Sequence, residues 1–181
     1  MRTRLTMLLA AAAVVALSGC GDNATTNTAG LAPRTDAQPS EQDRAWMATI
    51  HQGNLAEIEA GRLAEKKGAT DQVKSIGRML VDDHSQFDKK VTETASQLAI
   101  QLPAAPTSAQ TAMAKRLQDA KGKEFDKEFV VGMVKAHKTA IEATKEEISK
   151  GSSPAVVALA KSASPTLQEH LKALKKAQED Y

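Results

Sequence analysis

The sequence predicts an all-α protein, an up-down-up-down four-helix bundle with an extra short helix between the second and third long helices. Three observations predict this fold. From Ser40 onward, apolar residues recur every three or four positions, and no alternating run typical of a strand occurs. Ala, Lys, Glu, Gln and Leu, which favour helices, dominate the same region. Five of the six prolines fall outside the periodic segments: Pro33, Pro39, Pro103, Pro106 and Pro154.

The first two long helices have clear boundary residues. We expect the first over 41–67, with Ser40 as its N-cap and Gly68 as a left-handed C-cap. We expect the second over 71–102, with Thr70 as its N-cap and prolines after its end. Their apolar stripes are Met47, Ile50, Asn54 and Ile58, then Val73, Ile76, Leu80, His84, Phe87, Val91 and Leu98. The connection between them is short, so these helices should be antiparallel.

The remaining helices follow the same pattern. A short segment covers 107–120, the third long helix 123–150, and the fourth 154–180, which begins after Ser153 with a proline in its first turn. Pro165 lies inside the fourth helix and should kink it. The stripes are Phe125, Phe129, Met133, His137, Ile141 and Ile148, then Val156, Ala160, Ala163, Leu167, His170, Leu174 and Ala177.

Charge and composition exclude several classes of function. The 181 residues carry 24 basic and 22 acidic side chains, and the two counts become equal once Arg2 and Arg4 are removed with a leader. A neutral chain with 3% aromatic residues has neither the charge nor the stacking platforms for nucleic acid, so we expect no nucleic-acid partner. A single cysteine allows no internal disulfide and no thiolate metal cluster.

The N-terminus predicts a lipid anchor. Residues 1–19 have a basic start and an apolar run of 13 residues, too short to span a membrane, as in a signal peptide. The run ends in Leu-Ser-Gly-Cys, which resembles a bacterial lipobox whose Cys20 is lipidated; the alternative is an ordinary secretory signal that leaves the cysteine free. Residues 20–39 then form a flexible tether and 40–181 the bundle. We expect an extracytoplasmic protein of the bacterial cell envelope, anchored to the membrane by this lipid.

Each long helix carries one of the four histidines of the chain, on or beside its apolar stripe: His51, His84, His137 and His170. In the antiparallel order above, a rise of about 1.5 Å per residue places all four within about 5 Å along the bundle axis. Asp83 precedes one of them in the chain, and Glu57 lies on the first helix near that level. We therefore expect four imidazoles and nearby acids to meet in the middle of the bundle.

Two interpretations of this layer stay open. Imidazoles suit zinc, copper, iron or nickel, and bundle cores hold such ions, so a divalent metal is one candidate ligand. The candidate ligands are His51, His84, His137, His170, Glu57 and Asp83. Alternatively, the same side chains form a hydrogen-bonded polar layer that fixes helix register. The di-iron pattern Glu-x-x-His is absent, and no catalytic motif or catalytic residue is identified.

The order of several short motifs resembles a known bacterial family. The motifs are His51-Gln52-Gly53-Asn54-Leu55-Ala56-Glu57-Ile58, Gly61-Arg62-Leu63-Ala64 and Val81-Asp82-Asp83-His84, followed by Gly122, Phe125-Asp126, His137, Pro165 and His170. Together they are similar to the domain-of-unknown-function family 4142 (DUF4142). The resemblance covers about residues 41–174 and implies a ferritin-like bundle in secreted or envelope proteins, with no established reaction.

Two hypotheses of function follow. The first is a non-enzymatic lipoprotein that interacts with an unidentified partner in the envelope. The alternative is a metal-binding or metal-dependent redox protein that uses the histidine layer.

Overall fold

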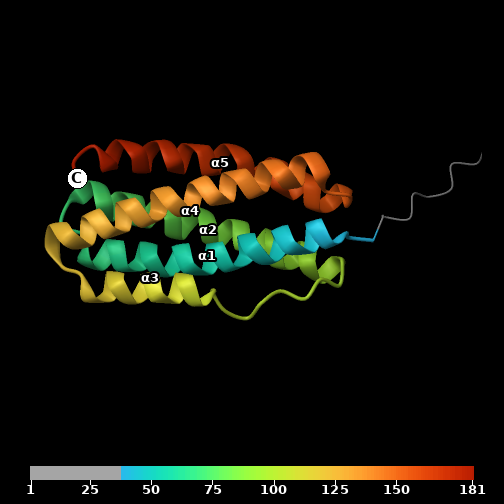
Figure 1. Cartoon of the computed structure of the whole chain (residues 1–181), viewed down its shortest axis with the longest axis horizontal. Coiled ribbons are helices and arrows are strands. Elements are labelled where there is room, and N and C mark those ends of the chain that lie inside the picture. The colour runs from blue at the N-terminus through green and yellow to red at the C-terminus, as the bar shows by residue number, and fades with distance from the viewer. Residues whose placement is uncertain (1–37) are drawn as a thin grey trace, which may run out of the picture. The chain divides into compact units, whose positions relative to one another are not determined.

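The computed structural model describes residues 38–181, and their regular secondary structure is entirely helical (Figure 1). The helices are α1 (Glu41–Lys67), α2 (Asp71–Gln97), α3 (Ser108–Asp119), α4 (Gly122–Lys150) and α5 (Pro154–Gln178). The predicted all-α four-helix bundle with an extra short helix, α3, is confirmed. The predicted signal peptide, Cys20 and most of the tether lie outside the described residues. None of the described helices is long and apolar enough to cross a membrane.

The direction of the last two long helices differs from the expected order, since the bundle runs up-down-down-up. At the start of α4, Asp126 Oδ2 accepts a hydrogen bond of 3.0 Å from the backbone N–H of Thr70, which precedes α2. Just after the other end of α4, the N–H of Ser153 donates a hydrogen bond of 3.1 Å to Asp43 in the first turn of α1. The reason is a crossover, 98–121, that returns the chain along the bundle and contains α3 (Figure 1). One such crossover is typical of ferritin-like bundles.

The end of α2 also differs from the expectation, because the helix stops at Gln97 rather than at residue 102. Ala99 has a positive φ of 51°, and the N–H of Ile100 bonds to Ala95 O at 2.8 Å. This is the six-residue hydrogen bond of a Schellman motif, which usually has glycine at the left-handed position. An alanine in that position is not a recognisable stop signal in the sequence, whereas the two prolines downstream are.

Gly68 and Pro165 lie where the sequence predicts them, but Gly68 has a different backbone conformation from the one expected. Gly68 ends α1 as expected, but at φ −50° and ψ 131° it is not left-handed. The position suits glycine for another reason: an added Cβ would lie 2.7 Å from Ala64 O. Pro165 lies inside α5 as expected, and the helix continues through it.

The apolar core is divided into two clusters. Phe125, Phe129, Leu80 and Leu174 belong to the first, and Trp46, Met47, Val91 and Leu167 belong to the second. α1 and α5 each pack against both α2 and α4, so neighbouring long helices are antiparallel all round. Each long helix contributes to both clusters and passes between them at buried polar side chains: Asn54, Glu57, His84, His137 and His170. The fold therefore places a polar layer in the middle of the bundle.

α1 and α2 touch through their backbones at two glycines. A Cβ added to Gly77 would lie 2.7 Å from Gly61 O, and a Cβ added to Gly61 would lie 2.8 Å from Gly77 O. Only glycine allows the two helices to come this near. The contact lies one helical turn from Glu57 on α1. The short separation of the two helices here therefore places the Glu57 carboxylate close to the side chains of α2.

Candidate metal centre

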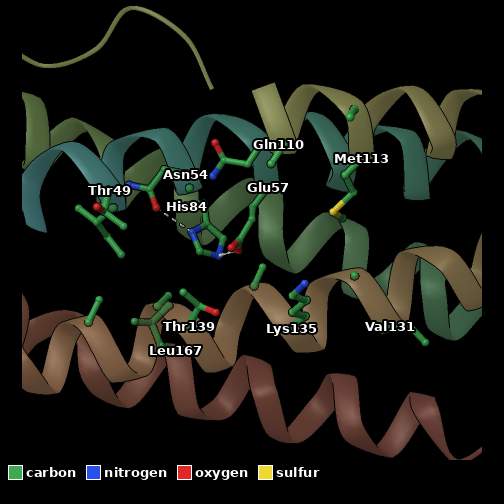
Figure 2. Close-up of a pocket in the computed structure, with 18 of the residues that line it drawn as sticks. Thr49, Asn54, Glu57, His84, Gln110, Met113, Val131, Lys135, Thr139 and Leu167 are labelled. Carbon is green, nitrogen blue, oxygen red and sulfur yellow. Dashed lines mark hydrogen bonds and ion pairs between the residues drawn. The ribbon is translucent and has the colours of Figure 1, made fainter. Parts of the chain in front are cut away.

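Three of the four histidines meet in the polar layer, one each from α2, α4 and α5. His84, His137 and His170 each direct one ring nitrogen inward, and these nitrogens all lie within 4.8 Å of one another. Glu57 from α1 joins them, since its Oε2 lies 2.8 Å from His84 Nε2 and 3.5 Å from His137 Nε2 (Figure 2). We call these four side chains the histidine cluster. Each long helix thus supplies one donor, and all four side chains are buried.

The outer nitrogen of each imidazole is bonded to a hydrogen-bond acceptor. His137 Nδ1 lies 3.0 Å from Met133 O, and His170 Nε2 lies 2.8 Å from Asp83 Oδ2. His84 Nδ1 lies 2.9 Å from Asn54 Oδ1. A carbonyl or carboxylate oxygen can only accept, so each of these ring nitrogens carries the proton. In the neutral form of each ring, the inner nitrogen then carries the lone pair, as in metal-ligating histidines whose other nitrogen is held by an oxygen.

The Asn54 amide is itself fixed in orientation. Its Nδ2 donates to Asp88 Oδ1 at 3.1 Å, which leaves Oδ1 to accept from His84. His51 Nδ1 bonds to the same Asp88 oxygen at 2.8 Å. His51 and Asp88 therefore support the cluster from outside, through Asn54.

The inner atoms of the cluster face only one another. Among residues 38–181, Glu57 Oε2 and His84 Nε2 are buried atoms without a hydrogen bond of acceptable geometry, although they lie 2.8 Å apart. His137 Nε2 and His170 Nδ1 face each other at 3.3 Å. Two lone pairs at this distance repel unless a proton or a cation lies between them. The distance also equals the separation of about 3.3 Å between two ligands of a tetrahedral ion with bonds of about 2.0–2.1 Å.

The charges in the cluster suit a cation. Burial works against ionisation of Glu57, but the charges of His137 and His84 outweigh it and lower the pKa of the carboxyl to about 2. Burial lowers the pKa values of His137 and His170 below their ordinary value. Burial also opposes a charge on His84, yet the attraction of Glu57 raises its pKa. The ionised Glu57 carboxylate and the lowered pKa values of His137 and His170 favour metal binding, whereas the raised pKa of His84 means that a proton competes with the metal at this ring.

The structure brings together four of the six predicted ligand candidates, and the other two take different places. Asp83 lies outside the cluster and orients His170. His51 is not part of it, because Glu57 is six residues further along α1, about 9 Å. The expected common height of the four histidines follows only if α5 runs antiparallel to α1. In the structure α5 runs parallel to α1, which places His170 at the height of Glu57 along the bundle axis, away from His51.

Sequence reasoning missed the supporting roles of Asn54 and Asp88. For both residues the sequence contains a signal that could have indicated the role. Asn54 is a polar residue within the apolar stripe of α1, and Asp88 follows His84 by four residues and so shares its helix face.

Two pockets border the cluster on different sides of the bundle. A groove of about 610 Å³ between α1, α3 and α4 is lined in part by Glu57 and His84 (Figure 2). A smaller pocket of about 220 Å³ between α2 and α5 is lined by Asp83, His84 and His170, and the Asp83 side chain is 44% exposed. The smaller pocket has the more polar lining. Its partly exposed Asp83 carboxylate is hydrogen-bonded to His170 of the cluster.

The fold and the site define a class: a single-crossover four-helix bundle with three histidines and one carboxylate buried between two apolar clusters. The chain belongs to the family "Domain of unknown function (DUF4142)", which matches residues 28–177 and confirms the resemblance seen in the sequence. No curated protein matches significantly.

Solved structures share the fold at low sequence identity. A DUF305 fragment from Deinococcus radiodurans is 13% identical, with a TM-score of 0.69 over 79% of this chain and 99% of the fragment. CopM in the Cu(I)-bound form is 16% identical, with a TM-score of 0.63, and in the Cu(II)-bound form 18% identical, with a TM-score of 0.65. Both CopM matches cover 76% of this chain and 96% of CopM. At these identities the likeness establishes the fold.

Proposed function

We propose that this protein binds one divalent transition-metal ion, copper(II) in the first place, through His84, His137, His170 and Glu57. The observation that carries the proposal is the orientation of the three imidazoles. Each has its outer nitrogen bonded to an oxygen acceptor, so in the neutral rings three lone pairs and a carboxylate oxygen are directed at one another. A hydrogen-bonded polar layer would need protons between these inner atoms, so protons and a metal ion compete for the same positions.

The donor set favours copper or zinc over harder ions. Three nitrogens and one oxygen suit borderline metals, whereas magnesium and calcium prefer oxygen ligands. Among divalent first-row ions, copper binds most tightly to a given nitrogen and oxygen site. The fold shared with CopM, which has been solved in copper-bound forms, supports the same choice.

Four protein donors also support a binding role without catalysis. Closed four-coordinate sites are typical of structural or storage functions, whereas catalytic sites keep one position open for substrate. When bound, the ion would supply Lewis acidity and, for copper, a redox couple. The cluster residues would hold it between two apolar clusters, where their hydrogen bonds to Asn54, Met133 and Asp83 fix the ring orientations.

Metal titration of the untagged chain tests the proposal. We expect one copper(II) per chain with a dissociation constant below about 1 μM, which corresponds to about 8 kcal/mol. The electron paramagnetic resonance spectrum of the bound copper should show coupling to imidazole nitrogens. Zinc, added separately, should bind to the same site and compete with copper. If neither ion binds below the micromolar range, the cluster is a structural polar layer.

We further propose that a lipid on Cys20 anchors the protein to the membrane on the extracytoplasmic side. The support is the lipobox-like sequence and the polar tether that follows it. Replacing Cys20 with Ser removes the only thiol of the chain and should abolish labelling by a radioactive fatty acid. Ser18→Ala, which keeps a small residue before the cysteine, is the matched control and should still be labelled. Equal labelling of the Cys20→Ser chain would contradict the anchor.

A further inference from the structure

The groove between α1, α3 and α4 has the size of a small-molecule site. Its volume of about 610 Å³ falls within the usual range of about 300–1,000 Å³. It is open because small residues line it, including Gly53, Ala112, Ala136 and Ala140. A Cβ added to Gly53 would meet nothing within 4 Å. The short α3 therefore covers the apolar faces of α1 and α4 without filling the space beneath it.

An apolar side chain stands exposed at this groove. Val131 is 46% exposed, and Tyr181, at 37%, is the other exposed large hydrophobic residue within residues 38–181. Val131 also lines the groove. Val131 thus extends the apolar lining of the groove to the protein surface.

One charge along the groove has no partner. Arg116 faces Glu128 at 3.9 Å, and Glu57 faces His84 at 2.8 Å. Within the part of the chain that the structure describes, no carboxylate lies within 4 Å of Lys135 Nζ. Lys135 follows Val131 by one turn of α4, and Figure 2 shows its ammonium turned toward the groove. The groove therefore combines an apolar lining with the ammonium group of an exposed lysine that forms no ion pair within the described residues.

We propose that this groove binds a small molecule with an apolar body and a single anionic head, of the class of medium-chain carboxylates. The body lies along the glycine and alanine positions of α1, α3 and α4, and the head pairs with Lys135. The site does not require the metal, although Glu57 and His84 form part of its wall.

The test uses three ten-carbon probes that differ only in the head: decanoate, decanol and decyltrimethylammonium. The protein is the metal-free full chain with Cys20→Ser, so that no detergent competes. Trp46, the only tryptophan of the chain, lines the groove and reports binding by its fluorescence. We expect saturable binding of one decanoate, roughly tenfold tighter than decanol, because a charge-assisted hydrogen bond is added. The cationic probe should bind more weakly than decanol. No saturable change, or equal binding of all three heads, would overturn the proposal.

Two variants locate the probe. Gly53→Phe should fill the groove and weaken decanoate binding at least tenfold, whereas Gly53→Ala adds one methyl group to open space and should leave it nearly unchanged. Lys135→Met should reduce decanoate binding to the level of decanol without changing decanol binding. Thermal unfolding and circular dichroism verify that each variant is folded. If Gly53→Phe binds decanoate as tightly as Gly53→Ala, the probe binds elsewhere and the groove assignment is wrong.

Discussion

Replacing Gly77 with alanine is expected to lower the free energy of unfolding by about 2 kcal/mol, although alanine is the better helix former. The added Cβ would lie 2.7 Å from Gly61 O, 2.9 Å from Ala64 Cβ and 3.0 Å from Glu65 N. Two of these atoms belong to the backbone of α1, so the helices must separate. Overpacking of this kind costs about 3 kcal/mol, and helix propensity returns about 1 kcal/mol. Thermal unfolding of the metal-free protein should show a midpoint lower by roughly 4–8 °C.

Gly53→Ala provides the matched control, because it makes the same chemical change in the interior of α1. Its Cβ meets open space, so only the propensity term acts, and the unfolding free energy should rise by up to about 1 kcal/mol. The two substitutions therefore differ in sign. If Gly77→Ala stabilises the protein as Gly53→Ala does, the backbone contact between α1 and α2 is not as close as described.

The same contact connects packing to the candidate metal centre. Glu57 lies one turn before Gly61 on α1, and His84 lies two turns after Gly77 on α2. A wider separation of the helices moves the Glu57 oxygen away from His84, so Gly77→Ala should also weaken copper binding. This effect would arise without any change in the donor side chains.

The sequence predicted the helices and the inward direction of three ligands because both depend on local pattern. Apolar stripes with a period of three to four residues define which face of a helix is buried, and His84, His137 and His170 lie on such stripes. The caps Ser40 and Thr70 are also local, and both accept the expected backbone hydrogen bonds.

The levels of the side chains along the bundle could not be predicted in the same way. They depend on the direction in which a helix runs, and the crossover after α2 leaves that direction open. With the wrong direction for the last long helix, the predicted position of His170 along the bundle axis coincided with that of His51. The roles of Asp83 and Asp88 likewise depend on contacts between different helices, His170 with Asp83 and His51 with Asp88, which no single stripe contains.

A graded series of substitutions should separate a metal site from a structural layer. His137→Gln removes a proposed ligand and should weaken copper binding at least 100-fold. Asp83→Asn removes the acceptor that orients His170 and should weaken it about 10–100-fold, as outer-shell changes do. His51→Gln alters a side chain three hydrogen bonds away from the cluster, through Asp88 and Asn54, so less than a tenfold change is expected. Competition titration against a chelator of known affinity measures all three.

Thermal unfolding of the same variants with and without copper then decides what the histidines do. An ion that binds only the folded protein stabilises it by about 2.7 kcal/mol at 100 times its dissociation constant. The wild-type chain and His51→Gln should gain this stability at the copper concentration chosen for wild type, and His137→Gln should not. Without copper, His137→Gln should already be less stable by about 1 kcal/mol, the net contribution of one hydrogen bond, because Met133 O loses the imidazole N–H and keeps only its helical donor under either interpretation. Only the response to copper therefore distinguishes them, and equal stabilisation of all three chains would place the ion outside the histidine cluster.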